Sequence, residues 1–109
     1  MTPFADSTDL LNDGTALAER MRHDGYLFLR GLLPAEPIHE LQQQIGTIVR
    51  EAGWLRSDRP VADAIADPVG FCVDPDPNYL TVLRRINLLE AYHTLKHHPR
   101  LIAFFERML

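Results

Sequence analysis

A short run of the sequence, from Tyr26 to Arg30, has the strongest strand pattern in the chain. It is rich in aromatic and aliphatic residues, and nearly every position is apolar. This pattern is typical of a strand buried on both faces, rather than of one with a solvated face. Such a strand needs neighbours, because its backbone N–H and C=O groups would otherwise have no partners. No second run of comparable strength follows, so the predicted strand requires more sheet than this chain offers.

Helical patterns flank this strand on both sides. Leu17 and Met21 lie four residues apart and predict a short helix between Gly14 and His23. Asp24-Gly25 should end that helix, because glycine accepts the left-handed backbone that follows many helices.

A longer amphipathic helix is predicted from Pro37 to Ala52. Pro34-Ala35-Glu36-Pro37 opens it, since proline suits the first turn and acids suit the positive helix start. Its apolar residues recur at spacings of three and four: Ile38, Leu41, Ile45, Ile48, Val49, Ala52 and Leu55. Gly53 is the expected stop.

Two further helices are predicted in the last third of the chain. Asn78 can cap a long helix whose apolar positions are Leu80, Leu83, Ile86, Leu89, Tyr92 and Leu95. Pro99 should break it, because the residue before a proline avoids helical angles. The last helix starts at Pro99 and carries a stripe of Leu101, Ile102, Phe105, Met108 and Leu109. The chain ends inside that stripe, and we expect on this ground that it is a piece of a larger domain.

The segment from Arg56 to Asn78 is predicted to be a loop, because prolines and aspartates interrupt it throughout. One helical turn is expected around Ala62–Ala66 and a short extended piece at Phe71–Val73. Loops of this length inside a compact chain are usually functional, or connect parts of a larger fold.

The composition narrows the classes of protein and partner. A chain of 109 residues with 46% hydrophobic residues is one globular domain at most. Its net charge of −4 and the lack of a basic run argue against nucleic acid as a partner. It has no apolar stretch long enough for a membrane span and no secretory leader pattern. Cys72 is the only cysteine, which fits a reducing compartment. We therefore expect a soluble cytoplasmic chain without a membrane partner.

The histidines do not form a recognisable metal motif. The chain has five: His23, His39, His93, His97 and His98. Non-haem Fe(II) oxygenases bind their metal through two histidines and a carboxylate, usually with an H-x-D or H-x-E motif. None of the five is followed by an acid in that position. His93 and His97 would share a helix face, but the glutamate that zinc hydrolases place beside the first histidine is missing and Lys96 would repel a cation.

Other polar residues favour structural roles. Asp74 and Asp76 predict a turn with helix capping, because the glycine and glutamate of a calcium loop are absent. Cys72, between two apolar residues, is typical of a buried small side chain. Of Arg84 and Arg85, only one can face inward on a helix, and solvated surface is the expected place. We therefore assign no catalytic, cofactor-binding or metal residue.

Two separated motifs in this sequence resemble a known enzyme family. The first is Asp24-Gly25-Tyr26-Leu27-Phe28-Leu29-Arg30-Gly31-Leu32-Leu33-Pro34, followed by the proline-started helix. The second is His98-Pro99-Arg100-Leu101, followed by Phe104 to Leu109. Together, and in this order, they are similar to the N-terminus of the phytanoyl-CoA dioxygenase family.

This resemblance implies a double-stranded β-helix (jelly-roll) oxygenase that uses Fe(II), O₂ and 2-oxoglutarate to oxidise a small-molecule substrate. In that family the iron ligands and the 2-oxoglutarate-binding arginine lie further along than Leu109. The N-terminal helices support the barrel, and an N-terminal strand joins its major sheet. The expected fold is therefore α+β and mainly helical here, with residues 1–109 forming the N-terminal part of one incomplete domain. The Arg56–Asn78 loop would lie near the substrate mouth.

Three functions remain open from the sequence. The chain can be the N-terminal scaffold of such a dioxygenase, inactive alone. It can be a stand-alone interaction or oligomerisation module that self-associates through exposed apolar helix faces. It can also be one half of a split enzyme whose second chain supplies the barrel.

Overall fold

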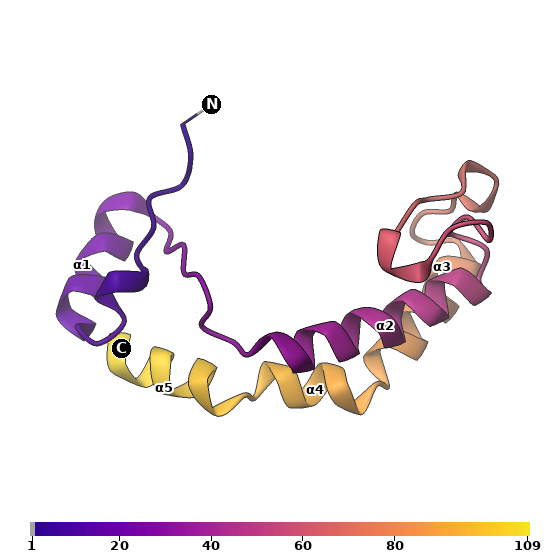
Figure 1. Ribbon diagram of the computed structural model, residues 1–109. Coiled ribbons are helices and arrows are strands. Elements are labelled where there is room, and N and C mark those ends of the chain that lie inside the picture. Colours follow the sequence, from indigo (N-terminus) through magenta and orange to yellow (C-terminus); the bar gives the residue numbers. More distant parts are fainter. Residues whose placement is uncertain (1) are drawn as a thin grey trace. The chain divides into compact units, whose positions relative to one another are not determined.

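The structure is a computed structural model in which residues 2–109 are described, and it is mainly helical (Figure 1). Its five α-helices are α1 (Gly14–Asp24), α2 (Ala35–Glu51), α3 (Pro77–Asn87), α4 (Glu90–Lys96) and α5 (Pro99–Met108). Three 3₁₀ turns complete the elements: η1 (Thr8–Leu10), η2 (Val61–Asp63) and η3 (Pro68–Gly70). Across residues 2–109 there is no sheet, only two isolated β-bridges. The expected helical content is confirmed, whereas nothing in the fold shows a jelly-roll origin.

The chain divides into two compact units. The first comprises the N-terminal segment to Ala35 together with Lys96–Leu109, and the second comprises Glu36–Leu95. Leu17 and Phe104 are the buried apolar residues of the first unit, and Ile48 and Val82 are those of the second, among the residues described. Each unit therefore has a small core.

The first unit is built on the packing of α1 against α5. Leu17 of α1 is fully buried and Phe104 of α5 is 5% exposed. Gly14 allows the two helices to approach, because a Cβ at this position would overlap the backbone carbonyl of Arg107. The Arg107 guanidinium donates a hydrogen bond to the Leu11 carbonyl just before α1. The N- and C-terminal segments of the chain are thereby joined.

The ends of α1 match the sequence prediction closely. The Asp13 carboxylate accepts a hydrogen bond from the Ala16 N–H at 3.0 Å and caps the N-terminus. Gly25 adopts a left-handed backbone with φ of +78° and ends the helix. The helix predicted over Gly14–His23 is confirmed to within one residue.

The strand predicted at Tyr26–Arg30 is wrong as a regular strand. The segment forms a single parallel bridge, between Asp6 and Phe28, with the Ser7 N–H donating to the Phe28 carbonyl at 2.8 Å. The neighbouring N-terminal segment turns into η1 at Thr8, so a second pair of ladder hydrogen bonds has no partner strand. Tyr26 to Leu29 are only half-buried. One bridged residue does not make a ladder of hydrogen bonds, so the segment is not a regular strand.

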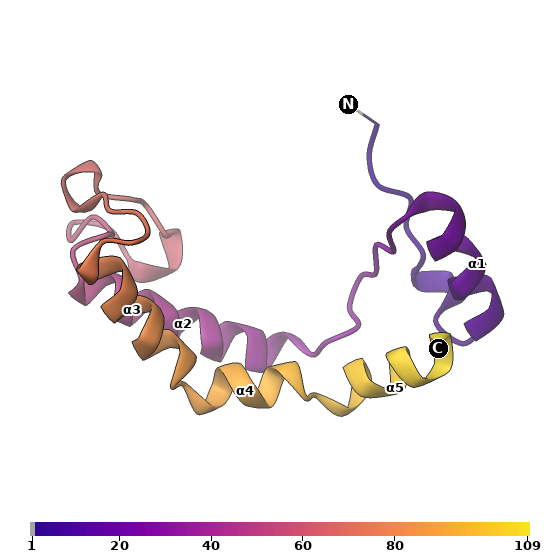
Figure 2. The same ribbon diagram turned by 180° about the vertical axis from the view of Figure 1, so that it is seen from behind.

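The second unit runs from α2 through the long loop into α3 and α4, which lead back along α2 (Figures 1 and 2). The α2 helix starts two residues before the predicted Pro37 and ends at Glu51. At its end, the Trp54 N–H donates to the Val49 carbonyl and the Gly53 N–H to the Arg50 carbonyl, with Gly53 at φ of +81°. These two bonds form the Schellman motif that a terminal glycine permits.

The helix predicted to begin with an Asn78 cap differs in two ways. Its N-cap is Asp76, whose carboxylate accepts from the Asn78 N–H at 2.8 Å, while Pro77 occupies the first turn. It also breaks well before Pro99. The Leu88 and Leu89 N–H groups bond to carbonyls three residues earlier, and α3 and α4 are separate helices. The last helix, predicted from Pro99, is confirmed as α5.

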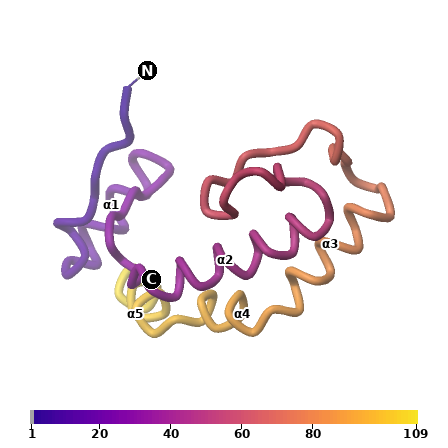
Figure 3. Tube along the Cα trace, turned by 45° about the vertical axis from the view of Figure 1, so that its right-hand side comes forward, coloured from indigo at the N-terminus to yellow at the C-terminus, as the bar shows by residue number. Residues whose placement is uncertain are grey.

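The Arg56–Asn78 loop is confirmed as largely irregular, and Figure 3 follows it from α2 to α3. An antiparallel bridge joins Leu55 to Ala66 at its base. The helical turn lies at η2, slightly before the predicted Ala62–Ala66, and η3 adds a second turn. Gly70 lies so close to Gly53 that a Cβ on Gly70 would overlap the Gly53 carbonyl. Close backbone approach of two glycines therefore holds the loop to the end of α2.

Candidate functional site

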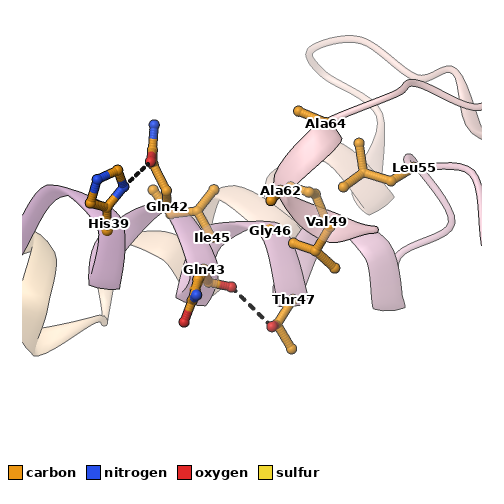
Figure 4. Close-up of a pocket in the computed structure, with 11 residues that line it drawn as sticks. His39, Gln42, Gln43, Ile45, Gly46, Thr47, Val49, Leu55, Ala62 and Ala64 are labelled. Atoms are coloured by element: carbon orange, nitrogen blue, oxygen red, sulfur yellow. Dashed lines mark hydrogen bonds between the residues drawn. The ribbon is translucent and has the colours of Figure 1, made fainter. Parts of the chain in front are cut away.

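A groove of about 560 Å³ lies in the second unit between α2 and the turn around η2 (Figure 4). Its polar side chains all come from α2: His39, Gln42, Gln43 and Thr47. Its apolar side chains come from α2 and from the segment after it: Ile45, Val49, Leu55, Val61, Ala62 and Ala64. This volume falls within the range of small-molecule sites.

The groove has a polar end and an apolar end. Figure 4 shows His39 and Gln42 together at one end, and Leu55 and Ala64 at the other. The His39 Nδ1 lies 3.2 Å from the Gln42 Oε1. The ring and the amide thus lie within hydrogen-bonding distance, and together they present both N–H donors and an acceptor to a ligand.

A glycine inside α2 explains why the groove forms here. A Cβ on Gly46 would overlap the Val61 side chain, so only glycine lets η2 sit against the helix. Glycine within a helix costs about 1 kcal/mol relative to alanine. The Thr47 hydroxyl donates to the Gln43 carbonyl at 2.9 Å, one turn earlier, so it is used within the helix. Gly46 therefore lowers the stability of α2 but permits the close contact with Val61 beside the groove.

The lining contains no Asp, Glu, Lys or Arg. The walls therefore offer hydrogen bonds and apolar contact. The arrangement suits binding of an uncharged molecule.

The side chains with a shifted pKa, Asp6, Arg56 and Asp58, do not line the groove. In the first unit, the Thr8 hydroxyl and N–H donate to the Asp6 carboxylate and, with Arg30 nearby, lower the pKa of Asp6. In the second unit, the Arg56 guanidinium donates two hydrogen bonds to Asp58, which lowers the pKa of Asp58 and raises that of Arg56. Both carboxylates lie at the surface; Asp6 joins the N-terminal segment to Arg30, whereas Asp58 contacts only its near neighbour Arg56.

The five histidines are scattered over the described structure. His23 lies 2.6 Å from Asp24 at the end of α1, and the His93 ring contacts the Asn87 carbonyl. The His98 Nδ1 accepts from the Arg100 N–H at 3.1 Å and caps α5. Only His39 lines the groove. Within residues 2–109, no three His, Cys, Asp or Glu side chains gather as metal ligands.

The remaining candidates have structural places. Asp76 caps α3, which confirms the capping role predicted there. Cys72 is a half-buried free thiol. Arg84 and Arg85 are both exposed, as expected, and the Arg85 guanidinium pairs with Glu51 of α2 at 2.6 Å. None of them lines the groove.

The sequence pattern does not predict the groove, and His39 was a candidate there only as a metal ligand. Its opposite wall comes from the loop, and no periodicity locates an irregular segment against a helix. The one available signal was Gly46, because a glycine inside an otherwise amphipathic helix often marks a close approach.

None of the helices in residues 2–109 combines the length and apolar character that crossing a bilayer requires. A scan against protein-family models finds no match, and searches of curated proteins and of solved structures find no similar chain.

Proposed function

We propose that residues 1–109 are the N-terminal scaffold of a phytanoyl-CoA-dioxygenase-like enzyme that uses Fe(II) and 2-oxoglutarate to oxidise a small molecule. The proposal rests on the motif at Asp24–Pro34 and on the second motif at His98–Leu101. In this role the chain supports a barrel and positions it, and the barrel carries the chemistry.

The open edge at Tyr26–Arg30 is the observation that supports this proposal best. Only Phe28 is bridged, and the Leu27 and Leu29 N–H groups have no acceptor within the described residues. The side chains of Tyr26 to Leu29 are half-buried, and Arg30 is exposed. An extended apolar segment with unused backbone donors is suited to pairing with a further strand.

The residues of this chain do not fit an iron site. None of the five histidines in the sequence has an acid at the H-x-D or H-x-E spacing. Among residues 2–109, no three possible metal ligands lie together. The iron would therefore be held by the proposed barrel, and no catalytic step is assigned to a residue here.

The first test is an assay of the purified 109-residue chain with Fe(II) and 2-oxoglutarate. Succinate should stay at background, and robust succinate formation would contradict a scaffold role. The second test is co-expression with a chain that contains an H-x-D motif. Co-purification should be accompanied by slower amide exchange at Leu27 and Leu29, and unchanged exchange at both would argue against strand pairing.

Exposed apolar side chains favour a second candidate, a stand-alone interaction module. Val69 and Phe71 of the loop are 94% and 78% exposed, and Leu88 after α3 is 84% exposed. Light scattering of the purified chain separates the two candidates. A discrete folded oligomer supports the module, whereas aggregation that a barrel chain relieves supports the scaffold.

A further inference from the structure

We propose that the groove along α2 binds a small, uncharged amphiphile, with a hydrogen-bonding head at His39 and Gln42 and an apolar body against Leu55 and Val61. The proposal does not rest on an oxygenase role, because the groove belongs to the second unit alone.

The head group is identified by the polar end of the groove. The His39 ring lies 3.2 Å from the Gln42 amide, and together the two groups present both N–H donors and an acceptor to a ligand. A hydroxyl or a primary amide can satisfy a donor and an acceptor at once. A carboxylate satisfies only donors, and no Lys or Arg lines the groove to balance its charge. The site therefore selects a neutral head.

The body of the ligand is identified by the other wall. Ile45 and Val49 of α2 and Leu55 and Ala62 of the following segment line the groove, and all of them are aliphatic (Figure 4). Aliphatic walls without an aromatic side chain suit an alkyl chain rather than a stacked ring. A volume of about 560 Å³ has room for a medium-length chain.

Gly46 allows the two walls of the groove to pack closely together. Its missing side chain allows Val61 to rest on the helix backbone, which fixes η2 beside α2 before any ligand arrives. A site formed in advance needs less ordering on binding.

The probe is 1-octanol, with octanoate as the charged comparator of the same chain length. Binding is followed by amide chemical shifts in NMR and by fluorescence of Trp54, the only tryptophan, which directly precedes Leu55. We expect saturable octanol binding with a dissociation constant on the order of 1 mM, as befits so small a ligand. Octanoate should bind at least about fivefold more weakly than octanol.

Two variants and one control locate the site. Ala62→Phe fills the apolar end and should abolish saturable binding. Gln42→Leu removes the head-group donor and should weaken octanol binding about fivefold. Gln44→Leu lies on α2 outside the groove, where its amide contacts Glu40, and should leave binding unchanged.

Three results would overturn the proposal: shifts that map to the exposed 69–73 loop or α5, equal binding by Ala62→Phe, or preference for octanoate. Circular dichroism of each variant confirms that the helices persist. If Ala62→Phe fails to fold, Ala64→Leu gives a second obstruction at the same end.

Discussion

The two units of this chain hold themselves together by different means. In the first, segments far apart in sequence are tied directly: Arg107 donates to the Leu11 carbonyl, and Leu17 of α1 is fully buried. In the second, glycines that lack a side chain allow close contacts: Val61 lies against Gly46, and Gly53 lies against Gly70. Both units have a small core and a glycine contact, at Gly14 in the first unit, so they differ mainly in how far apart along the chain these contacting segments lie. The two should therefore fail under different substitutions.

The N-terminal segment adds a second tie to the first unit. The Arg30 N–H donates to the Thr8 hydroxyl at 2.8 Å, and that hydroxyl donates to Asp6. Phe4 also meets Tyr26 edge-on, with ring centroids 4.9 Å apart. These contacts cross about twenty residues of sequence, whereas the Arg56–Asp58 pair in the second unit joins neighbours in one turn. Both units leave large apolar side chains in solvent, among them Leu109 in the first and Val69 in the second.

The largest effect should come from Leu17→Ala. It removes a fully buried side chain from a small core and should cost about 3 kcal/mol in the free energy of unfolding of the first unit. Amide exchange should accelerate in α1 and α5 while Trp54 fluorescence, a reporter of the second unit, stays native. Met21→Ala, in the same helix at a 42% exposed position, is the control and should cost less than about 1 kcal/mol. Equal losses in both variants would contradict the assigned core.

Gly70→Ala should be the matching lesion in the second unit. Its Cβ would overlap the Gly53 carbonyl, and overpacking of this kind costs about 2 kcal/mol. Trp54 fluorescence should report the loss, since the Trp54 Cα lies 3.2 Å from the added Cβ position. Gly25→Ala meets no atom within 4 Å but must adopt φ of +78°, so it should cost about 1 kcal/mol and act on the first unit only. A Gly70→Ala protein of native stability would show that the loop is not held at this point.

Helix capping should distinguish the units less strongly. Asp13→Ala and Asp76→Ala each remove a carboxylate cap and should cost about 1 kcal/mol, measured by exchange in α1 and α3 respectively. Asn78→Ala is the control for the second variant, because Asn78 contributes only its N–H to the cap. A larger loss from Asn78→Ala than from Asp76→Ala would restore the cap predicted from the sequence.

The smallest effect should be the response to acid. The folded-state pKa of Asp6 is lowered, so its contribution to stability is present above its unfolded value of about 3.9 and is lost as the pH falls through the folded value. Asp6→Asn should flatten the acid dependence of exchange in the first unit below about pH 4. Asp58→Asn, also at a carboxylate of lowered pKa, should leave both units unchanged because its partner is two residues away. The reverse ranking would show that the local pair matters more than the N-terminal tie.

Much of the helical fold follows from patterns that act over a few residues. The ends of α1 and α2 were predictable because Gly25 and Gly53 accept the left-handed backbone wherever the chain goes. The start of α5 was predictable from Pro99 for the same kind of reason. The break between α3 and α4 was not, because the apolar spacing of Leu80 to Leu95 continues through it unchanged. The α3 cap was misplaced because Asp76 and Asn78 are both good capping residues, and Pro77 decides between them.

The candidate groove could not be predicted at all beyond the hint from Gly46. Four of its apolar side chains belong to the segment around η2, whose position depends on the Leu55–Ala66 bridge and on the Gly70 contact. The strand at Tyr26–Arg30 failed for a related reason. Its residues have strand propensity, but a strand exists only when a neighbour supplies hydrogen bonds along its length.

By itself, the sequence determined both ends of α1, the end of α2 and the start of α5, since caps, prolines and terminal glycines satisfy or block backbone hydrogen bonds within a single turn. Only the tertiary structure decided that Tyr26–Arg30 lies extended with one bridge, that Arg107 reaches Leu11, and that a loop closes a groove on α2. Those outcomes depend on which distant surfaces meet. Sequence spacing does not carry that information, because packing joins residues through space rather than along the chain.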